Sequence, residues 1–126
     1  MKGLLDTTVL IAREQGRPLE ALPEESAISV VTLAELHIGV LLADEPRTTA
    51  QRMRSLSEVE RGFDALPVDR DVARNFATIV ADARKRGRKP KIMDAWIAAT
   101  AVTHDLPVYT QDLDFDDLAK VQVVRV

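Results

Sequence analysis

Short apolar runs alternate along the chain with longer segments whose apolar positions repeat at the period of a helix. The runs that predict strands are residues 3–5, 27–31, 65–68, 107–110 and 121–124. The segments that predict helices are residues 6–13, 32–41, 46–61, 72–83 and 92–102. Strands that alternate with helices, and that are apolar enough for burial on both faces, predict an α/β fold with a mostly parallel sheet.

Two of the expected helices have distinct patterns. In one, an apolar stripe at positions i, i+4, i+7, i+8 and i+11 predicts an amphipathic helix with one buried face. The stripe consists of Val72, Phe76, Ile79, Val80 and Ala83. In the other, residues 92–102 are apolar nearly all round apart from Asp94, which predicts a helix inside the core.

Length and composition narrow the class of protein. A chain of 126 residues with 46% hydrophobic and 29% charged residues predicts one folded domain over residues 1–126 and excludes a disordered chain. Cysteine is absent and only two histidines occur, so a metal ion would be held by oxygen atoms. The polar first segment and the lack of a long apolar run predict a cytoplasmic protein with no membrane segment.

Four carboxylates lie where an expected strand ends or an expected helix begins: Asp6, Glu35, Asp94 and Asp112. Asp6 and Asp112 follow strands, Glu35 lies one turn into a helix, and Asp94 lies near the start of the apolar helix. The carboxyl ends of parallel strands form the crevice in which open α/β sheets bind ligands. The sequence therefore predicts that these four side chains converge.

Each acid also has a purely structural interpretation. Asp6 could cap the first helix through its side chain. Thr32 and Glu35 fit the capping box that begins many helices. Asp94 is favoured by the helix dipole, although its apolar neighbours imply a costly burial. Asp112 suits an Asx turn.

Convergence of the acids would require neutralisation. Like charges about 5 Å apart repel by roughly 3 kcal/mol per pair at an effective dielectric constant of ~20. No Lys or Arg stands at an obvious spacing to relieve this repulsion. A hard divalent cation would do so, because Mg²⁺ prefers carboxylate oxygens and completes its shell with water and substrate phosphates; Mn²⁺ is also suitable.

A basic segment precedes Asp94, although the net charge of the chain is −3 and by itself favours no polyanionic partner. Its six cations within eight residues are Arg84, Lys85, Arg86, Arg88, Lys89 and Lys91. They could bind RNA phosphates, form a solvated helix end, or belong to a localisation signal or minor-groove arm. An aromatic content of 4% argues against base stacking as the main contact with RNA. We expect His37 and His104 to be structural.

The segments around the acids resemble those of PIN-domain nucleases, and most closely the toxin ribonucleases of VapBC-type toxin–antitoxin pairs. The matching segments are residues 4–11, 32–36, 94–101 and 107–115, and their order and spacing agree over essentially the whole chain. The resemblance implies a single PIN-like domain over residues 1–126, built as a three-layer α/β/α sandwich. It also implies a four-acid site that binds Mg²⁺ or Mn²⁺ and cleaves single-stranded or looped RNA.

The roles of the acids are carried over from this resemblance. Asp6, Glu35, Asp94 and Asp112 are the expected catalytic residues. Asp6 and Asp94 best match the direct metal ligands of the family. Asp112 would hold a second ion, or the waters of the first. Glu35 could orient or deprotonate the attacking water.

Neighbouring polar residues are expected to support the acids. Hydroxyls of Thr7, Thr8 and Thr110 could orient the carboxylates, or could serve only as caps and turn donors. Thr8 stands where the family frequently has serine, which keeps the hydroxyl. Within the acidic turn, Asp112 is the first choice for the fourth acid and Asp114 the second.

The resemblance implies further partners: an RNA substrate, a small DNA-binding antitoxin and a second copy of the chain in a homodimer. The activity would inhibit translation or growth. The best-supported alternative is a PIN-domain nuclease that processes RNA without an antitoxin. Aspartyl phosphatases fit less well, because they commonly have a second Asp at the position where Thr8 stands. Receiver-like signalling domains also fit less well, because they commonly have two adjacent acids after the first strand, where this chain has only Asp6. Retention of all four acids argues against a non-catalytic scaffold.

Overall fold

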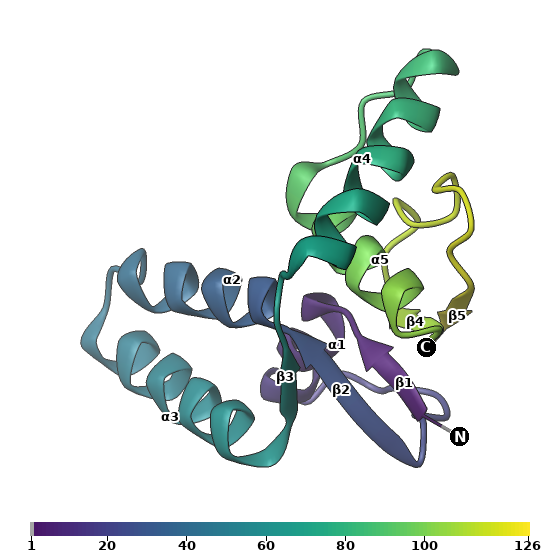
Figure 1. The fold of residues 1–126 in the computed structure, drawn as a ribbon. Coiled ribbons are helices and arrows are strands. Elements are labelled where there is room, and N and C mark those ends of the chain that lie inside the picture. The colour runs from purple at the N-terminus through teal and green to yellow at the C-terminus, as the bar shows by residue number, and fades with distance from the viewer. Residues whose placement is uncertain (1) are drawn as a thin grey trace.

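A computed structural model describes residues 2–126 and confirms the α/β fold (Figure 1). Its elements in chain order are β1 (Lys2–Leu5), α1 (Thr7–Glu14), β2 (Glu25–Ser29), α2 (Val30–Leu41), α3 (Pro46–Gly62), β3 (Asp64–Leu66), α4 (Arg70–Lys85), α5 (Ile92–Thr103), β4 (Val108–Thr110) and β5 (Val123–Arg125). The sheet has the strand order β3-β2-β1-β4-β5, and every neighbouring pair is parallel. All the carboxyl ends therefore lie at one edge.

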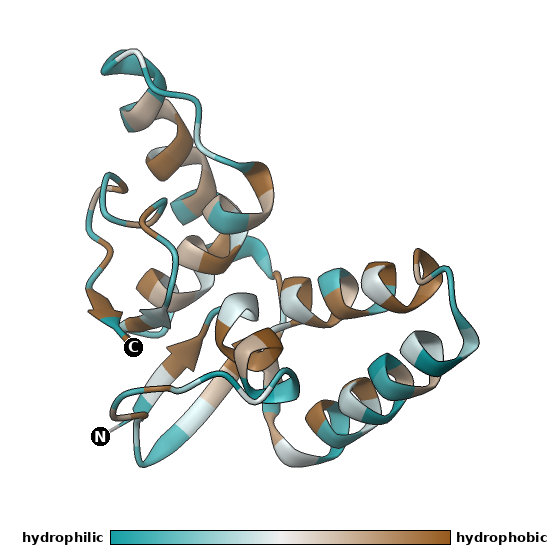
Figure 2. Ribbon diagram, turned by 180° about the vertical axis from the view of Figure 1, so that it is seen from behind, coloured by the Kyte–Doolittle hydropathy of each residue, from teal (hydrophilic) through white to brown (hydrophobic). Residues whose placement is uncertain are grey.

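Helices cover both faces of this sheet, as the resemblance to three-layer proteins implies. Successive residues of a strand point to opposite faces. Leu4 accordingly packs in one core with Ile97 of α5 and with α4. Leu5 packs in a second core with Val9 of α1 and Val59 of α3. Figure 2 shows apolar residues in β1 and α5, whereas the end of α4 and the loop after it are hydrophilic.

The boundary between β2 and α2 differs from the prediction. The strand ends at Ser29 and the helix begins at Val30, two residues earlier than expected. The Oγ of Ser29 caps the helix by accepting a hydrogen bond from the N–H of Val31 (3.0 Å). The capping box proposed for Thr32 and Glu35 is therefore wrong, and both side chains are free to face the carboxyl edge of the sheet.

The two edge strands are also displaced. β3 covers Asp64–Leu66 rather than residues 65–68, because Pro67 has no N–H to donate to a strand ladder. β5 covers Val123–Arg125 rather than residues 121–124. Among residues 2–126, none of the helices combines the length and the apolar character needed to cross a membrane.

Candidate active site

The carboxyl edge of the sheet brings together the four acids expected from the sequence. Asp6 follows β1, Glu35 lies in the second turn of α2, Asp94 lies in the first turn of α5, and Asp112 lies two residues after β4. Asp6, Glu35 and Asp112 lie close enough to Asp94 to raise its pKa by charge repulsion, and Asp114 does the same.

Asp94 is the most perturbed carboxyl of this group. Its side chain is 9% exposed, and Oδ2 is one of two buried side-chain oxygens among residues 2–126 that have no hydrogen-bond partner. Burial is the largest cause that raises its pKa, followed by repulsion from Asp6, and together the causes raise the pKa from 3.8 to about 7. A carboxyl with its pKa raised in this way favours a proton or a bound cation.

Asp6 is held by hydroxyl groups rather than by the helix that it precedes. It is 2% exposed and occupies the N-cap position of α1, but its side chain makes no cap hydrogen bond. The hydroxyls of Thr8 and Thr110 donate instead to Oδ2 of Asp6, at 2.7 and 2.8 Å. The capping interpretation of Asp6 is therefore wrong. The bond from Thr110 links the end of β4 to the end of β1 across 104 residues of sequence, and the bond from Thr8 of α1 is local.

Thr7 supports Glu35 from the neighbouring helix. Its hydroxyl lies 2.7 Å from Oε1 of Glu35 and 3.0 Å from the hydroxyl of the fully buried Thr32. Burial raises the pKa of Glu35 above 4.5, the hydrogen bond from Thr7 lowers it, and repulsion from Asp6 raises it further. The net shift is upward, so Glu35 binds a proton more tightly than an exposed glutamate does.

The acidic turn after β4 carries the remaining acids. The N–H of Asp112 donates to the hydroxyl of Thr110 (2.9 Å), and the N–H of Asp114 donates to Oδ1 of Asp112 (2.9 Å). The second bond closes the Asx turn expected for Asp112. Asp94, Asp112 and Asp114 each present a carboxylate oxygen within 4.8 Å of the others. Asp114 thus joins this compact group, whereas Asp6 lies outside it and repels Asp94 by its charge.

Two cations beside the acids were not found from the sequence. Lys91 Nζ lies 2.7 Å from Oδ2 of Asp114, and this hydrogen bond is the main cause that raises the pKa of Lys91. Arg125 of β5 donates to the carbonyl of Asp112 and to both carboxylate oxygens of Asp116 (2.6 and 2.8 Å). Both ion pairs are with acids other than the four predicted ones, and none of those four forms an ion pair within residues 2–126. Lys91 nevertheless interacts electrostatically with Asp112 and Asp94, and so offsets part of the repulsion that the sequence left unrelieved. The position of Lys91, one turn before Asp94, was a usable signal, whereas nothing in the sequence indicated Arg125.

Half of the basic segment is paired with acids of the same chain. Arg86 lies 2.9 Å from Asp82, Arg88 lies 2.7 Å from Asp117, and Lys91 pairs with Asp114. These ion pairs are exposed, so each contributes little to stability. The other three cations, which form no ion pair within residues 2–126, are Arg84, Lys85 and Lys89.

His37 and the tryptophan make contacts between helices, and the other histidine lies at a helix end. His37 is exposed on α2 and its Nε2 lies 3.2 Å from Oε1 of Glu60 on α3. His104 ends α5 as its C-cap residue. Trp96 stacks on Phe76 of α4 with ring centroids 3.7 Å apart. Its large apolar surface therefore joins α4 to α5 rather than lining the acidic site.

Comparisons with known proteins agree with this fold. The PIN domain family matches residues 3–121. Ribonuclease VapC5 of Mycobacterium tuberculosis is 46% identical over 129 residues, which cover 98% of this chain and 95% of the relative. Ribonuclease VapC4 of the same organism is 37% identical, covering 99% of this chain and 97% of the relative. A crystal structure of VapBC-5, a member of the VapBC family of toxin–antitoxin systems from M. tuberculosis, matches with a TM-score of 0.87 and 43% identity, and the match covers 99% of this chain and 98% of that one.

The α/β/α layers, the parallel sheet and the acids at its carboxyl edge define a PIN-type fold. The identities to whole VapC proteins extend along nearly the full chain, well beyond the segments that contain the acids. The chain belongs to the PIN-domain family and, within it, to the VapC proteins.

Proposed function

We propose that this chain is a metal-dependent endoribonuclease that hydrolyses RNA phosphodiesters and serves as the toxin of a type II toxin–antitoxin pair, inhibiting translation or growth. Metal dependence is typical of PIN-domain nucleases, and the relatives described above are named ribonucleases. The observation that carries the proposal is the buried, unpartnered carboxylate oxygen of Asp94 in the middle of a group of acids. A cation bound among these carboxylates would offset both their mutual repulsion and the cost of burying Asp94.

The donor set suits a hard divalent ion. All candidate ligands are carboxylate oxygens, which favours Mg²⁺ or Mn²⁺ over softer metals. We assign metal binding to Asp6, Asp94 and Asp112, and the compact grouping of carboxylate oxygens adds Asp114 to this set. A bound divalent ion would neutralise the scissile phosphate and lower the pKa of a nearby water.

The remaining residues act as a base and as positioning groups. Glu35 is half-buried at the rim of the acids, and its raised pKa brings it closer to the range in which a carboxylate accepts a proton from an attacking water. Thr7 orients Glu35 through a 2.7 Å hydrogen bond. Thr8 and Thr110 hold the carboxylate of Asp6 in one orientation through hydrogen bonds to Oδ2. These bonds fix the geometry before the substrate arrives.

RNA and protein partners would use different parts of the surface. Arg84 and Lys85 end α4 and Lys89 follows in the loop before α5, and these unpaired cations would contact RNA phosphates near Asp94. A cognate small DNA-binding antitoxin and a homodimer follow from the similarity to VapBC complexes. Exposed apolar side chains at the end of the α2–α3 hairpin support a protein contact there, because such patches are rarely left in water. They are Ile38, Leu41, Leu42 and Met53.

The proposal is tested by cleavage of total cellular RNA with mapping of the new ends. We expect cleavage by the wild-type protein with Mg²⁺ or Mn²⁺, none in EDTA, and a loss of at least about 100-fold for Asp94→Asn, as is typical when a group that stabilises the transition state is removed. Asp44→Asn, in the exposed α2–α3 turn, is the matched control and should remain active. Equal cleavage by Asp94→Asn and wild type, after identical purification, would reject the assignment.

A further inference from the structure

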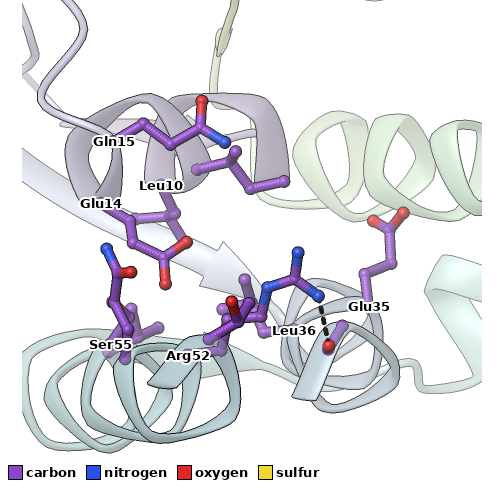
Figure 3. Close-up of a pocket in the computed structure, with 12 residues that line it drawn as sticks. Leu10, Glu14, Gln15, Glu35, Leu36, Arg52 and Ser55 are labelled. Atoms are coloured by element: carbon purple, nitrogen blue, oxygen red, sulfur yellow. Dashed lines mark hydrogen bonds between the residues drawn. The ribbon is translucent and has the colours of Figure 1, made fainter. Parts of the chain in front are cut away.

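A cavity of about 300 Å³ lies between α1, α2 and α3, beside the acids but distinct from them (Figure 3). Its walls are partly apolar, formed by Leu10 of α1, Leu36 of α2 and Val59 of α3. Its volume is at the lower end of the range of small-molecule pockets, which suits a single planar group better than a larger ligand. Glu35 lines the cavity and also belongs to the acidic site, so the two share a wall.

Glu14 supplies an acceptor inside this cavity. It is the last residue of α1, and Figure 3 shows its carboxyl pointing into the space between α1 and the α2–α3 pair. Its Oε1 is the second of the two buried side-chain oxygens among residues 2–126 that have no hydrogen-bond partner. Buried carboxylate oxygens are rarely left without a donor, because desolvation is costly. The cavity therefore favours a ligand that donates hydrogen bonds to Glu14.

Arg52 supplies donors opposite this acceptor. Its Nη1 donates to the carbonyl of Gly39 at 2.6 Å, which anchors the guanidinium in the cavity between Glu14 and Glu35. Figure 3 shows the guanidinium raised from α3 toward α1. Within residues 2–126 it has no other hydrogen-bond acceptor, so its remaining N–H groups can bind a ligand.

We infer that this cavity binds one guanine base of the RNA substrate, an inference that rests on the proposed ribonuclease function. Guanine is the base that presents two adjacent donors, N1–H and N2–H₂, to one carboxylate, and Glu14 accepts both. Its O6 and N7 acceptors form the pattern that arginine recognises, and Arg52 faces them. Leu10 and Leu36 contact the faces of the ring. A guanine held here places its own nucleotide beside Glu35, and hence beside the phosphate to be cleaved.

Binding of mononucleotides tests this inference without any cleavage. The whole protein, in EDTA, is titrated with guanosine, inosine, adenosine, cytidine and uridine 5′-monophosphates and followed by ¹H–¹⁵N NMR. We expect guanosine monophosphate to bind about 5- to 150-fold more tightly than the adenosine, cytidine and uridine nucleotides, the range for one bidentate base contact. Inosine monophosphate, which lacks the N2 amine, should bind at least about 3-fold more weakly than the guanosine nucleotide.

Glu14→Gln is the decisive variant, because glutamine has the same shape but cannot accept both guanine donors. It should lose most of the preference for guanine and of the difference between guanosine and inosine, while its NMR spectrum remains that of a folded protein. Glu20→Gln, which changes the same charge on an exposed loop residue, should retain both. Unchanged guanine preference in Glu14→Gln, or no preference in the wild-type protein, would overturn the inference.

Two further outcomes separate the inference from its alternatives. N-acetyl-argininamide that binds in a Glu14-dependent manner, with no binding of guanosine monophosphate, would make the cavity a site for a protein side chain and would overturn the guanine assignment. Single-turnover cleavage of oligoribonucleotides that carry guanine or inosine beside the scissile bond gives a second readout, and only the wild-type protein should favour guanine. If the wild-type protein cleaves neither oligoribonucleotide but still prefers guanosine monophosphate, the proposed nuclease is rejected and the base site remains supported.

Discussion

Replacement of Asp94 by asparagine should stabilise the metal-free protein. The pKa of Asp94 is raised from 3.8 to about 7 in the folded state, so the folded protein holds this proton more tightly than the unfolded chain does. The free energy of unfolding of the metal-free wild type should therefore fall as the pH rises from about 4 to about 7 and change little above that range, as far as Asp94 is concerned. Asparagine carries no charge, and so removes this pH dependence.

The size of the effect follows from the same values. The difference between 3.8 and about 7 corresponds to about 4 kcal/mol at 1.36 kcal/mol per pKa unit, and screening by water at the open edge of the site reduces this to about 2–4 kcal/mol at pH 8. For a chain of 126 residues that is an increase in Tm of about 6–16 °C. At pH 5 the gain should be less than half as large, because the folded carboxyl is then mostly protonated and only the ionisation of the unfolded chain still favours unfolding.

Thermal unfolding followed by circular dichroism in EDTA, at pH 5 and pH 8, measures this difference for wild type, Asp94→Asn and the exposed control Asp44→Asn. Addition of Mg²⁺ at 100 times its dissociation constant should raise the stability of the wild type by about 2.7 kcal/mol and that of Asp94→Asn far less. A lower Tm for Asp94→Asn than for wild type at pH 8 in EDTA would refute the argument that Asp94 is held at the expense of stability. The same conclusion would follow from equal pH dependence of the two proteins.

Three other substitutions test separate parts of the structure. Thr110→Val removes donors to Asp6 and acceptors for Asp112, and should cost about 1–3 kcal/mol in urea unfolding while lowering the cleavage rate. Replacement of Arg84, Lys85 and Lys89 by Gln, in the Asp94→Asn background, should weaken the salt dependence of binding to single-stranded RNA. Measured by fluorescence anisotropy, the slope of log K against log salt should fall in magnitude by about 2. An unchanged slope would show that these cations do not bind RNA. Gly3→Ala should cost about 1–3 kcal/mol in the same urea assay, because its Cβ would collide with the Tyr109 ring.

The helices could be predicted from the sequence because their apolar periodicity extends over several turns. The stripe from Val72 to Ala83 lies within α4 and faces the core, as expected. The bounds of short strands are harder to predict, because a run of only a few residues shows little alternation. β3 and β5 each have three residues, and apolar residues beside them shifted their predicted bounds. At the start of α2, Ser29 and Thr32 are both acceptable caps, and the tertiary contact of Thr32 with Thr7 decides between them.

The acidic site was predictable because it follows from topology. Asp6 comes directly after β1 and Asp112 two residues after β4, and these strands are neighbours in a parallel sheet, so the approach of the two acids needs no knowledge of side-chain conformations. The contacts of Lys91 and Arg125 depend on where a loop and an edge strand lie in three dimensions, and no local pattern encodes that. The unpartnered oxygen of Glu14 is likewise visible only once α1, α2 and α3 are packed together.

The pairing of β1 with β4 has a consequence for the order in which the acidic site forms during synthesis of the chain. Because β4, one of the two partner strands of β1, is synthesised about 100 residues after it, a nascent chain emerging from the ribosome has Asp6 exposed long before Thr110 and Asp112 complete its surroundings. Prematurely terminated or proteolytically shortened products that lack this last portion cannot assemble the acids. The four acids can therefore come together only after the chain has been synthesised through Asp112.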